Sequence, residues 1–228
     1  MRLWGFVLIV LIGIGSYYLL REGFENESII FLTKDETASF LAEDPDAYIQ
    51  SMTPLDLQAR GYNNHNAYWQ ASIDSALEPD AALKEKVIKN IHAVRGKVKD
   101  PTIPWKIAFT TNAYEQNLPH TRQDIIFLKP NTVSEQILLH EMTHLYQRKH
   151  KKEFQAFLKT QGYQAWRLRK GYPRIRANPD LDEYIYMSPD NRLMVFIYNE
   201  SPKSIEDVIR PPGGHEYEHP NEEYAYAA

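Results

Sequence analysis

The stretch DIIFLKPNTVSEQILLHEMTHLYQ, residues 124–147, changes from one hydrophobic period to another within a few residues. Its first part, Asp124–Leu128, is a short apolar run with branched and aromatic side chains, which is typical of a buried strand. A proline ends that run. Thr132 and Glu135 then have the spacing of a capping box, so we expect a helix to begin near Val133. The sequence therefore predicts a strand, a short loop and a helix in immediate succession.

The predicted helix has one apolar face and one polar face. At 100° per residue, the apolar face carries Leu138, Leu139, Met142, Leu145 and Tyr146, and the other carries His140, Thr143, His144 and Gln147. The apolar face would pack on a core, which leaves the two histidines facing a cleft.

His140, Glu141 and His144 form an HExxH motif in this helix. Histidines four residues apart lie one turn apart on the same face, so both imidazoles can bind one Zn²⁺ at about 2.1 Å. The glutamate between them is placed to act on a water at the metal. We therefore predict a zinc site in which Glu141 is the general base.

A catalytic zinc site needs a third protein ligand, and His150 is the first of two candidates. It has the position of the last histidine in an HExxHxxGxxH motif, in which the glycine ends the helix so that this histidine turns back to the metal. Here Gln147 replaces the glycine, and the helical pattern continues. On a continuing helix, His150 would lie about 9 Å beyond His144 and roughly 100° off the zinc face. We therefore expect His150 to be solvated within a basic run.

The second candidate lies in the segment His219-Pro220-Asn221-Glu222-Glu223-Tyr224-Ala225-Tyr226, whose proline and carboxylates are typical of a first helical turn. The HExxH motif and this Pro-x-Glu-x-x-Ala-Tyr segment together resemble the gluzincin class of zinc metallopeptidases, including its compact single-domain forms. The resemblance covers these two motifs and the strand before the first, not the whole chain. It implies a glutamate ligand on a later helix, followed three positions on by a small residue. Glu222 with Ala225 fits that register, and Glu223 fits it less well; an acidic tail is the alternative.

Two further expectations follow from the resemblance to zincins. Their sheet has an edge strand that pairs with extended substrate, a role that Leu118–Arg122 would suit, with His120 as a candidate substrate contact. A lone loop histidine is, however, more often solvated. A zincin also commonly places a Tyr or His near its metal to stabilise the oxyanion, and Tyr217 is the candidate here.

An uncharged apolar run, LWGFVLIVLIGIGSYYLL, extends over Leu3–Leu20. Its length is just enough to cross a bilayer core, and aromatic residues near both ends suit the two interfaces. We therefore predict a membrane anchor over residues 1–22. Because Arg2 precedes the span and glutamates follow it, the N-terminus would be cytoplasmic and the catalytic domain extracytoplasmic. A cleaved signal peptide, which gives a secreted protein, is the alternative.

Residues 23–228 are enough for one domain, and the patterns predict an α+β, zincin-like fold with a small mixed sheet. The first part, 23–100, is predicted to be mostly helical, with capping signals at Thr33 and Thr53. The part from 101 to 228 contains the active-site helix, predicted strands at Trp105–Thr110 and Asp124–Leu128, and a predicted hairpin of Tyr184–Met187 with Leu193–Tyr198.

Composition limits the partners. The formal net charge is −4, which argues against nucleic acid as a partner, and the absence of cysteine excludes a disulfide framework. We therefore predict a membrane-anchored peptidase that acts on a peptide or protein outside the cytoplasm and holds one Zn²⁺ through His140, His144 and Glu222. A metzincin site through His150 is the alternative among enzymes. A non-catalytic, membrane-anchored binding or envelope protein, with a structural or vestigial metal, is the alternative from another class.

Overall fold

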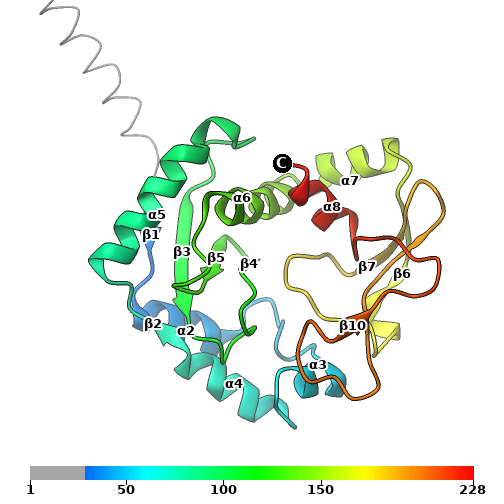
Figure 1. Ribbon diagram of the computed structural model, residues 1–228, viewed down its shortest axis with the longest axis horizontal. Helices are drawn as coiled ribbons and strands as arrows, with labels where there is room; N and C mark the ends of the chain where they lie inside the picture. Colours follow the sequence, from blue (N-terminus) through cyan, green and yellow to red (C-terminus); the bar gives the residue numbers. More distant parts are fainter. Residues whose placement is uncertain (1–28) are drawn as a thin grey trace, which may run out of the picture.

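A mixed sheet of five strands forms the framework of the computed structural model, which describes residues 29–228 (Figure 1). The strands are β1 Ile29–Phe31, β2 Ala76–Leu77, β3 Trp105–Thr110, β4 His120–Arg122 and β5 Ile125–Leu128. The strand β3 lies between β1 and β5 and is parallel to both. An antiparallel edge is formed by β4 against β5, and β2 pairs antiparallel with the last residues of β3.

Helices cover both faces of this sheet. They are α2 Lys34–Glu43, α3 Pro54–Ala59, α4 His65–Asp74, α5 Ala81–Val94 and α6 Glu135–Lys149, with the 3-10 turn η1 Arg95–Lys97 after α5. On one face, Ile107 and Ile126 lie in a core with α5 and α6. On the other face, Ala108 and Phe127 lie in a core with α2, α3 and α4. Because β5 is buried on both faces, it has no polar side, which explains the unbroken apolar run before the HExxH helix.

The chain after α6 forms a less regular part, which lies on the right in Figure 1. Its elements are α7 Lys151–Thr160, β6 Gln164–Leu168, the 3-10 turn η2 Arg169–Gly171, β7 Tyr184–Met187, β8 Leu193–Met194, β9 Ile197–Tyr198, β10 Val208–Ile209 and α8 Pro220–Tyr226. An antiparallel sheet has the order β6-β7-β8, and β9 pairs with β10. The last helix, α8, returns to lie beside α6 (Figure 1).

The α+β class and several local predictions are confirmed. Capping boxes at Thr33 and Thr53 begin α2 and α3, and both predicted strands before the active-site helix are present. The hairpin forms between β7 and β8, but its second predicted strand divides, because Ile197 and Tyr198 pair with β10 instead.

Other local predictions are wrong. The cap of α6 is Ser134, whose side chain accepts a hydrogen bond from the Ile137 amide, whereas the Thr132 hydroxyl bonds within the preceding turn. The helix also does not continue unbroken, since His150 separates α6 from α7 with a non-helical backbone. The patterns missed β1, β2 and β6, which are two to five residues long.

The predicted membrane-spanning architecture is corrected. The proposed anchor, Leu3–Leu20, lies outside the described residues. Within residues 29–228, no helix is long and apolar enough to cross a membrane. The longest of them, α6, has 15 residues and carries the HExxH motif, whereas a span needs about 20 apolar residues. The single-pass fold class and the localisation inferred from it therefore have no support in the structure.

Candidate metal centre

The helix α6 sets the two histidines of the HExxH motif side by side. Its apolar residues Leu138 and Met142 are buried in the core with the sheet, which fixes the rotation of the helix. One turn apart on the opposite side, His140 faces the cleft and His144 is buried. The predicted apolar face is confirmed, but of the predicted polar face only His140 lines the cleft, because Thr143, His144 and Gln147 are buried.

His140, His144 and Glu222 converge at one point. Their ligand atoms all lie within 4.8 Å of one another, and no other group of three or more such residues occurs in the described part of the chain. The Nε2 atoms of His140 and His144 are 3.0 Å apart. The Nε2 of His140 lies 3.4 Å from Glu222 Oε2, and the Nε2 of His144 lies 3.8 Å from Glu222 Oε1. Tetrahedral ligands at about 2.1 Å from one ion would be about 3.4 Å apart. The three residues therefore fit a zinc ion.

Glu222 is held in place by polar contacts at the start of α8. The Asn178 side-chain amide donates a hydrogen bond of 2.9 Å to its Oε1. His219 caps the helix by accepting a hydrogen bond from the Asn221 amide, and its other nitrogen lies 3.2 Å from Asp182. Although burial opposes ionisation, the nearby His144 and His140 lower the pKa of Glu222 to about 2. This carboxylate is therefore ready to bind a cation.

The adjacent carboxylate has a different role. Glu223 accepts a hydrogen bond of 2.9 Å from the Tyr163 hydroxyl and is not part of the converging group. Three positions after Glu222, Ala225 is 4% exposed where α8 packs against α6. A larger side chain there would separate the two helices. The geometry favours Glu222 over Glu223 as the ligand.

Gln147 connects the two ligand-bearing helices, a role that no sequence pattern indicates beyond its place on the histidine face. Its Oε1 lies 2.9 Å from His144 Nδ1, and its Nε2 donates a hydrogen bond of 2.9 Å to the Asn221 carbonyl. Because Oε1 only accepts, the Nδ1 of His144 carries the proton. The Nε2 lone pair is thereby left to face the convergence point.

Glu141 lies beside the convergence point and lines the cleft. It is 3% exposed, and its Oε2 has no hydrogen-bond partner among the described residues. Burial, with additional repulsion from Asp180 and Glu222, raises its pKa well above the usual value. A buried carboxyl with a free oxygen in a cleft is suited to exchange a proton with a bound molecule.

The cleft has a volume of about 840 Å³ and separates the sheet part from the irregular part. On the sheet side it is lined by Leu118, Pro119 and His120 and by α6. The opposite wall comes from three segments, which contribute Arg176–Asp180, Phe196, and Ile205, Glu206 and Val208, while α8 closes one end with Ala225 and Tyr226. The lining combines apolar residues with polar and charged ones in about equal number.

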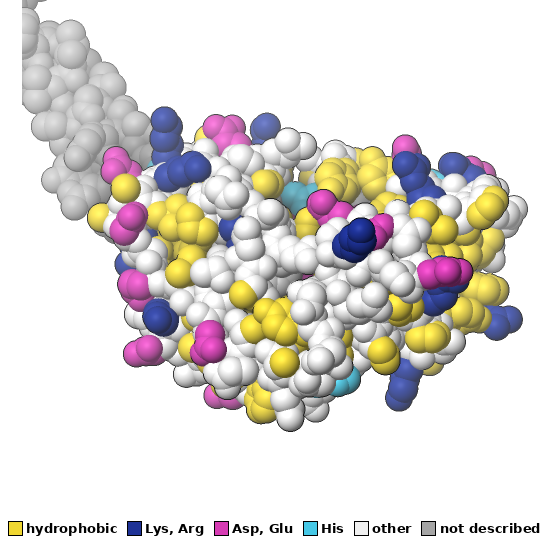
Figure 2. All heavy atoms as spheres, turned by 60° about the horizontal axis from the view of Figure 1, so that its bottom comes forward, with side chains coloured by type: hydrophobic (Ala, Val, Ile, Leu, Met, Phe, Trp, Pro, Cys, Tyr) yellow, Lys and Arg dark blue, Asp and Glu magenta, His cyan; other side chains and the backbone are white. Residues whose placement is uncertain are grey.

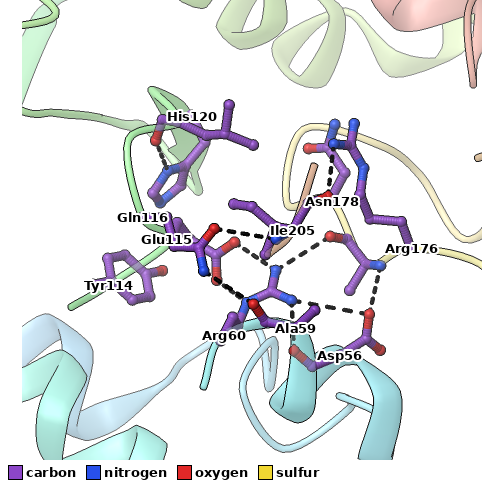
Figure 3. Close-up of polar contacts among 12 residues, drawn as sticks. Asp56, Ala59, Arg60, Tyr114, Glu115, Gln116, His120, Arg176, Asn178 and Ile205 are labelled. Atoms are coloured by element: carbon purple, nitrogen blue, oxygen red, sulfur yellow. Dashed lines mark hydrogen bonds and ion pairs between the residues drawn. The ribbon is translucent and has the colours of Figure 1, made fainter. Parts of the chain in front are cut away.

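Buried charges fix the wall opposite α6 (Figure 3). Arg60, the C-cap of α3, donates two hydrogen bonds to Glu115, at 2.8 and 2.5 Å, and Asp56 accepts one of 2.7 Å from the Ala177 amide. Although burial opposes ionisation, Arg60 lowers the pKa of Glu115 to about 2. The Ile205 backbone amide donates a hydrogen bond to the Gln116 side chain, which connects another segment of the same wall. Segments more than 50 residues apart therefore meet as one rigid surface.

The other predicted site residues lie as follows. His150 contacts Asp100 at 2.8 Å and does not join the converging group. Tyr217 packs against Tyr226, with ring centroids 5.6 Å apart, and it is Tyr226 that lines the cleft, 4.6 Å from the His140 ring. Tyr226 was overlooked as an oxyanion candidate, although its place four residues after Glu222 puts both on one face of α8.

The edge strand β4 is partly covered. Asp180 accepts hydrogen bonds from the amide and the hydroxyl of Thr121, at 2.7 and 2.6 Å. Arg148, one turn beyond His144, donates to the Thr121 hydroxyl at 3.0 Å. At this residue an incoming strand would have to displace the Asp180 carboxylate. Only the part of 118–122 before Thr121 faces the cleft, where His120 is buried rather than solvated.

Comparisons with protein-family models, with curated proteins and with solved structures found no match to this chain. The geometry of the site therefore carries the functional argument alone.

Proposed function

We propose that this protein is a zinc-dependent peptidase of the gluzincin type, with His140, His144 and Glu222 as the metal ligands. The observation that carries the proposal is their convergence at ligand spacing beside the buried, unpaired carboxyl of Glu141, at the side of a large cleft. Two histidines from one helix and a glutamate from a later helix match the ligand set that the resemblance implies.

Each site residue has a chemical task. A zinc ion held by three protein ligands polarises a carbonyl and lowers the pKa of a bound water to about 7. Glu141 accepts the proton of the attacking water through its free oxygen and returns it to the leaving amine. Tyr226 lies against His140 at the cleft surface, where its hydroxyl can donate a hydrogen bond to the developing oxyanion. The Tyr217 ring stacks on the Tyr226 ring and holds it in position.

The alternative of a closed structural site is less consistent with the geometry. A structural zinc takes four protein ligands, and His215 and His219, which lie just before and at the start of α8, are the histidines that could supply the fourth. His219 caps α8 and contacts Asp182, and the Nε2 of His215 lies 3.8 Å from Glu223. Neither joins the three ligands. The fourth position is therefore left for water or substrate.

The experiment that tests the proposal compares Glu141→Gln with wild type. This change keeps the size of the side chain and removes its basicity, so zinc content should stay at one equivalent while cleavage of a peptide library falls roughly 10²–10⁴-fold. Glu135→Gln is the matched control, because Glu135 also lines the cleft on the same helix but lies at its first turn.

Two results would overturn the proposal. Equal cleavage by wild type and Glu141→Gln would assign the activity to another site or protein. Zinc bound at one equivalent by wild type, without cleavage of any peptide, would favour the non-catalytic alternative.

A further inference from the structure

The segment that follows α6 is strongly basic. Residues 151–174, which we call the basic segment, contain seven Lys and Arg and one acidic residue, Glu153. This segment contributes +6 to a chain whose net charge is −4, so all the other residues together carry −10. On the right-hand part of the face in Figure 2, basic and acidic side chains lie among hydrophobic ones. The positive charge is therefore concentrated in one stretch of the chain, which contains α7, β6 and η2.

Three lysines of the basic segment are free to bind a ligand. Lys152, Lys159 and Lys170 are exposed and have no carboxylate within ion-pair distance among residues 29–228. Lys151, by comparison, already lies 3.7 Å from Glu183. Unpaired charges of one sign on one surface attract a partner of the opposite sign.

The strand β6 adds an unpaired backbone edge to the same surface. It pairs with β7 on one side only, and all five of its residues are exposed. Trp166 and Leu168 are 45% and 51% exposed, although strands at the edges of sheets rarely carry such large apolar side chains. Arg167 lies over the Trp166 ring and donates a hydrogen bond to the Tyr172 hydroxyl, which orders the aromatic part.

We propose that the free edge of β6, together with the basic segment that contains it, binds an extended, acidic segment of the protein substrate. This inference rests on the proposed peptidase function. The backbone groups of β6 would pair with the segment as an added strand, Trp166 and Leu168 would contact its apolar side chains, and Lys152, Lys159 and Lys170 would attract its carboxylates.

The chain itself limits the distance between this surface and the cleft. Arg176 lines the cleft wall, and it follows the end of η2 at Gly171 by five residues. Five residues span at most roughly 18 Å when fully extended. About five to six extended substrate residues would therefore connect the surface to the cleft, so one polypeptide can occupy both.

A polypeptide fits this surface better than a nucleic acid does. A strand edge offers alternating amide donors and carbonyl acceptors, which match another polypeptide backbone. A single-stranded nucleic acid instead needs aromatic rings that are free for stacking. Residues 164–168 provide one such ring, Trp166, whereas all five of these residues present exposed strand backbone.

The test measures binding with the full chain carrying Glu141→Gln, so that nothing is cleaved. Fluorescein-labelled (Glu-Val-Glu-Thr)₃ should bind at least tenfold more tightly than (Lys-Val-Lys-Thr)₃ by fluorescence anisotropy. It should also bind more tightly than (Glu-Pro)₆, whose prolines lack the amides needed for strand pairing. Changing Lys152, Lys159 and Lys170 to Glu together should weaken binding by about tenfold or more. Trp166→Ala, which keeps every charge, should weaken it severalfold.

Changing Lys86 and Lys89 to Glu is the matched control, because both are exposed lysines on the distant helix α5. This control should change the affinity for the acidic peptide by less than twofold. Equal losses in the control and in the triple variant would overturn the proposal. So would equal binding of the acidic and basic peptides, or tighter binding of an oligothymidine that the triple variant abolishes. If cleavage by wild type fails while this binding holds, only the proposed function falls.

Discussion

The helices α6 and α8 contribute ligands to the same candidate metal centre but are held by different means. With 15 residues, α6 buries a continuous apolar face against the sheet. With seven residues, α8 has no continuous apolar face and is fixed by polar contacts, which include the His219 cap and the Gln147 side chain, together with the packing of Tyr224 and Ala225. The histidine pair therefore follows from one helix and its core, whereas the position of Glu222 depends on several separate segments.

This difference identifies α8 as the part of the site that is easier to displace. A core-packed helix keeps its side chains in place even when one polar contact is lost. A two-turn helix has little stability of its own, so each tertiary contact that it loses changes where Glu222 lies. The predictions below begin with the ligand itself and move outward.

The largest effect is expected for Glu222→Ala. Removing a carboxylate ligand should lower zinc affinity by about 1,000-fold or more, which corresponds to roughly 4 kcal/mol. Glu223→Ala is the matched control on the same helix and should leave the affinity within a few-fold, because Glu223 contacts Tyr163 instead. His150→Ala should also have little effect, because His150 contacts Asp100. Competition titration with a zinc chelator gives all three affinities.

A different ranking of these variants would change the assignment. A loss for Glu223→Ala alone would shift the ligand by one residue. A loss for His150→Ala with little effect of Glu222→Ala would establish the metzincin arrangement.

A smaller effect is expected for Gln147, which contacts both helices. Gln147→Leu removes both hydrogen bonds and should lower zinc affinity about 10–100-fold, the usual cost of losing an outer partner of a histidine ligand. Gln147→Glu keeps an acceptor for His144 Nδ1 but loses the donor to the Asn221 carbonyl. If α8 is the weaker support, Gln147→Glu should lose most of the affinity that Gln147→Leu loses. Wild-type affinity in Gln147→Glu would show that only the histidine contact matters.

The same difference between α6 and α8 explains which parts of the site could be predicted from the sequence. The spacing of His140 and His144 is local, so a helical period was enough to place both on one face beside Glu141. The contacts that hold Glu222 join Asn178, Asn221 and Gln147, which no local pattern brings together. Its identification as a candidate therefore came from a resemblance, and the structure supplied the geometry.

The prediction of the strands was limited in the same way, because it depended on local apolar patterns. Strands of four to six residues buried on both faces gave clear apolar runs, and these were predicted at β3 and β5. The strand β6 is exposed on both faces and has no such pattern, so it was missed. The sequence favours Tyr217 as the oxyanion donor, whereas Tyr226 lines the cleft, because the packing of α8 against α6 decides which ring reaches it.

The smallest effect concerns His120, on the sheet side of the cleft, and it should appear in stability rather than in metal affinity. His120 stacks on Phe127 with ring centroids 5.2 Å apart, and its Nε2 is buried without a partner among the described residues. Burial and then the nearby Lys129 lower its pKa to about 3, although Glu115 acts in the opposite direction. The unfolded chain, with a histidine pKa of about 6.5, therefore takes up the proton first as the pH falls.

The contribution of His120 to the free energy of unfolding is thus fully present above pH 6.5 and is lost progressively as the pH falls toward 3. Between pH 6.5 and 5 the loss should amount to about 1–2 kcal/mol, since one pKa unit is worth about 1.4 kcal/mol. His120→Gln should remove that part of the pH dependence, measured by urea unfolding of the metal-free protein at each pH. His65→Gln, at an exposed position on α4, is the matched control. An unchanged slope in His120→Gln would mean that protons reach His120 in the native state, and the sheet side of the cleft would then be no more rigid than α8.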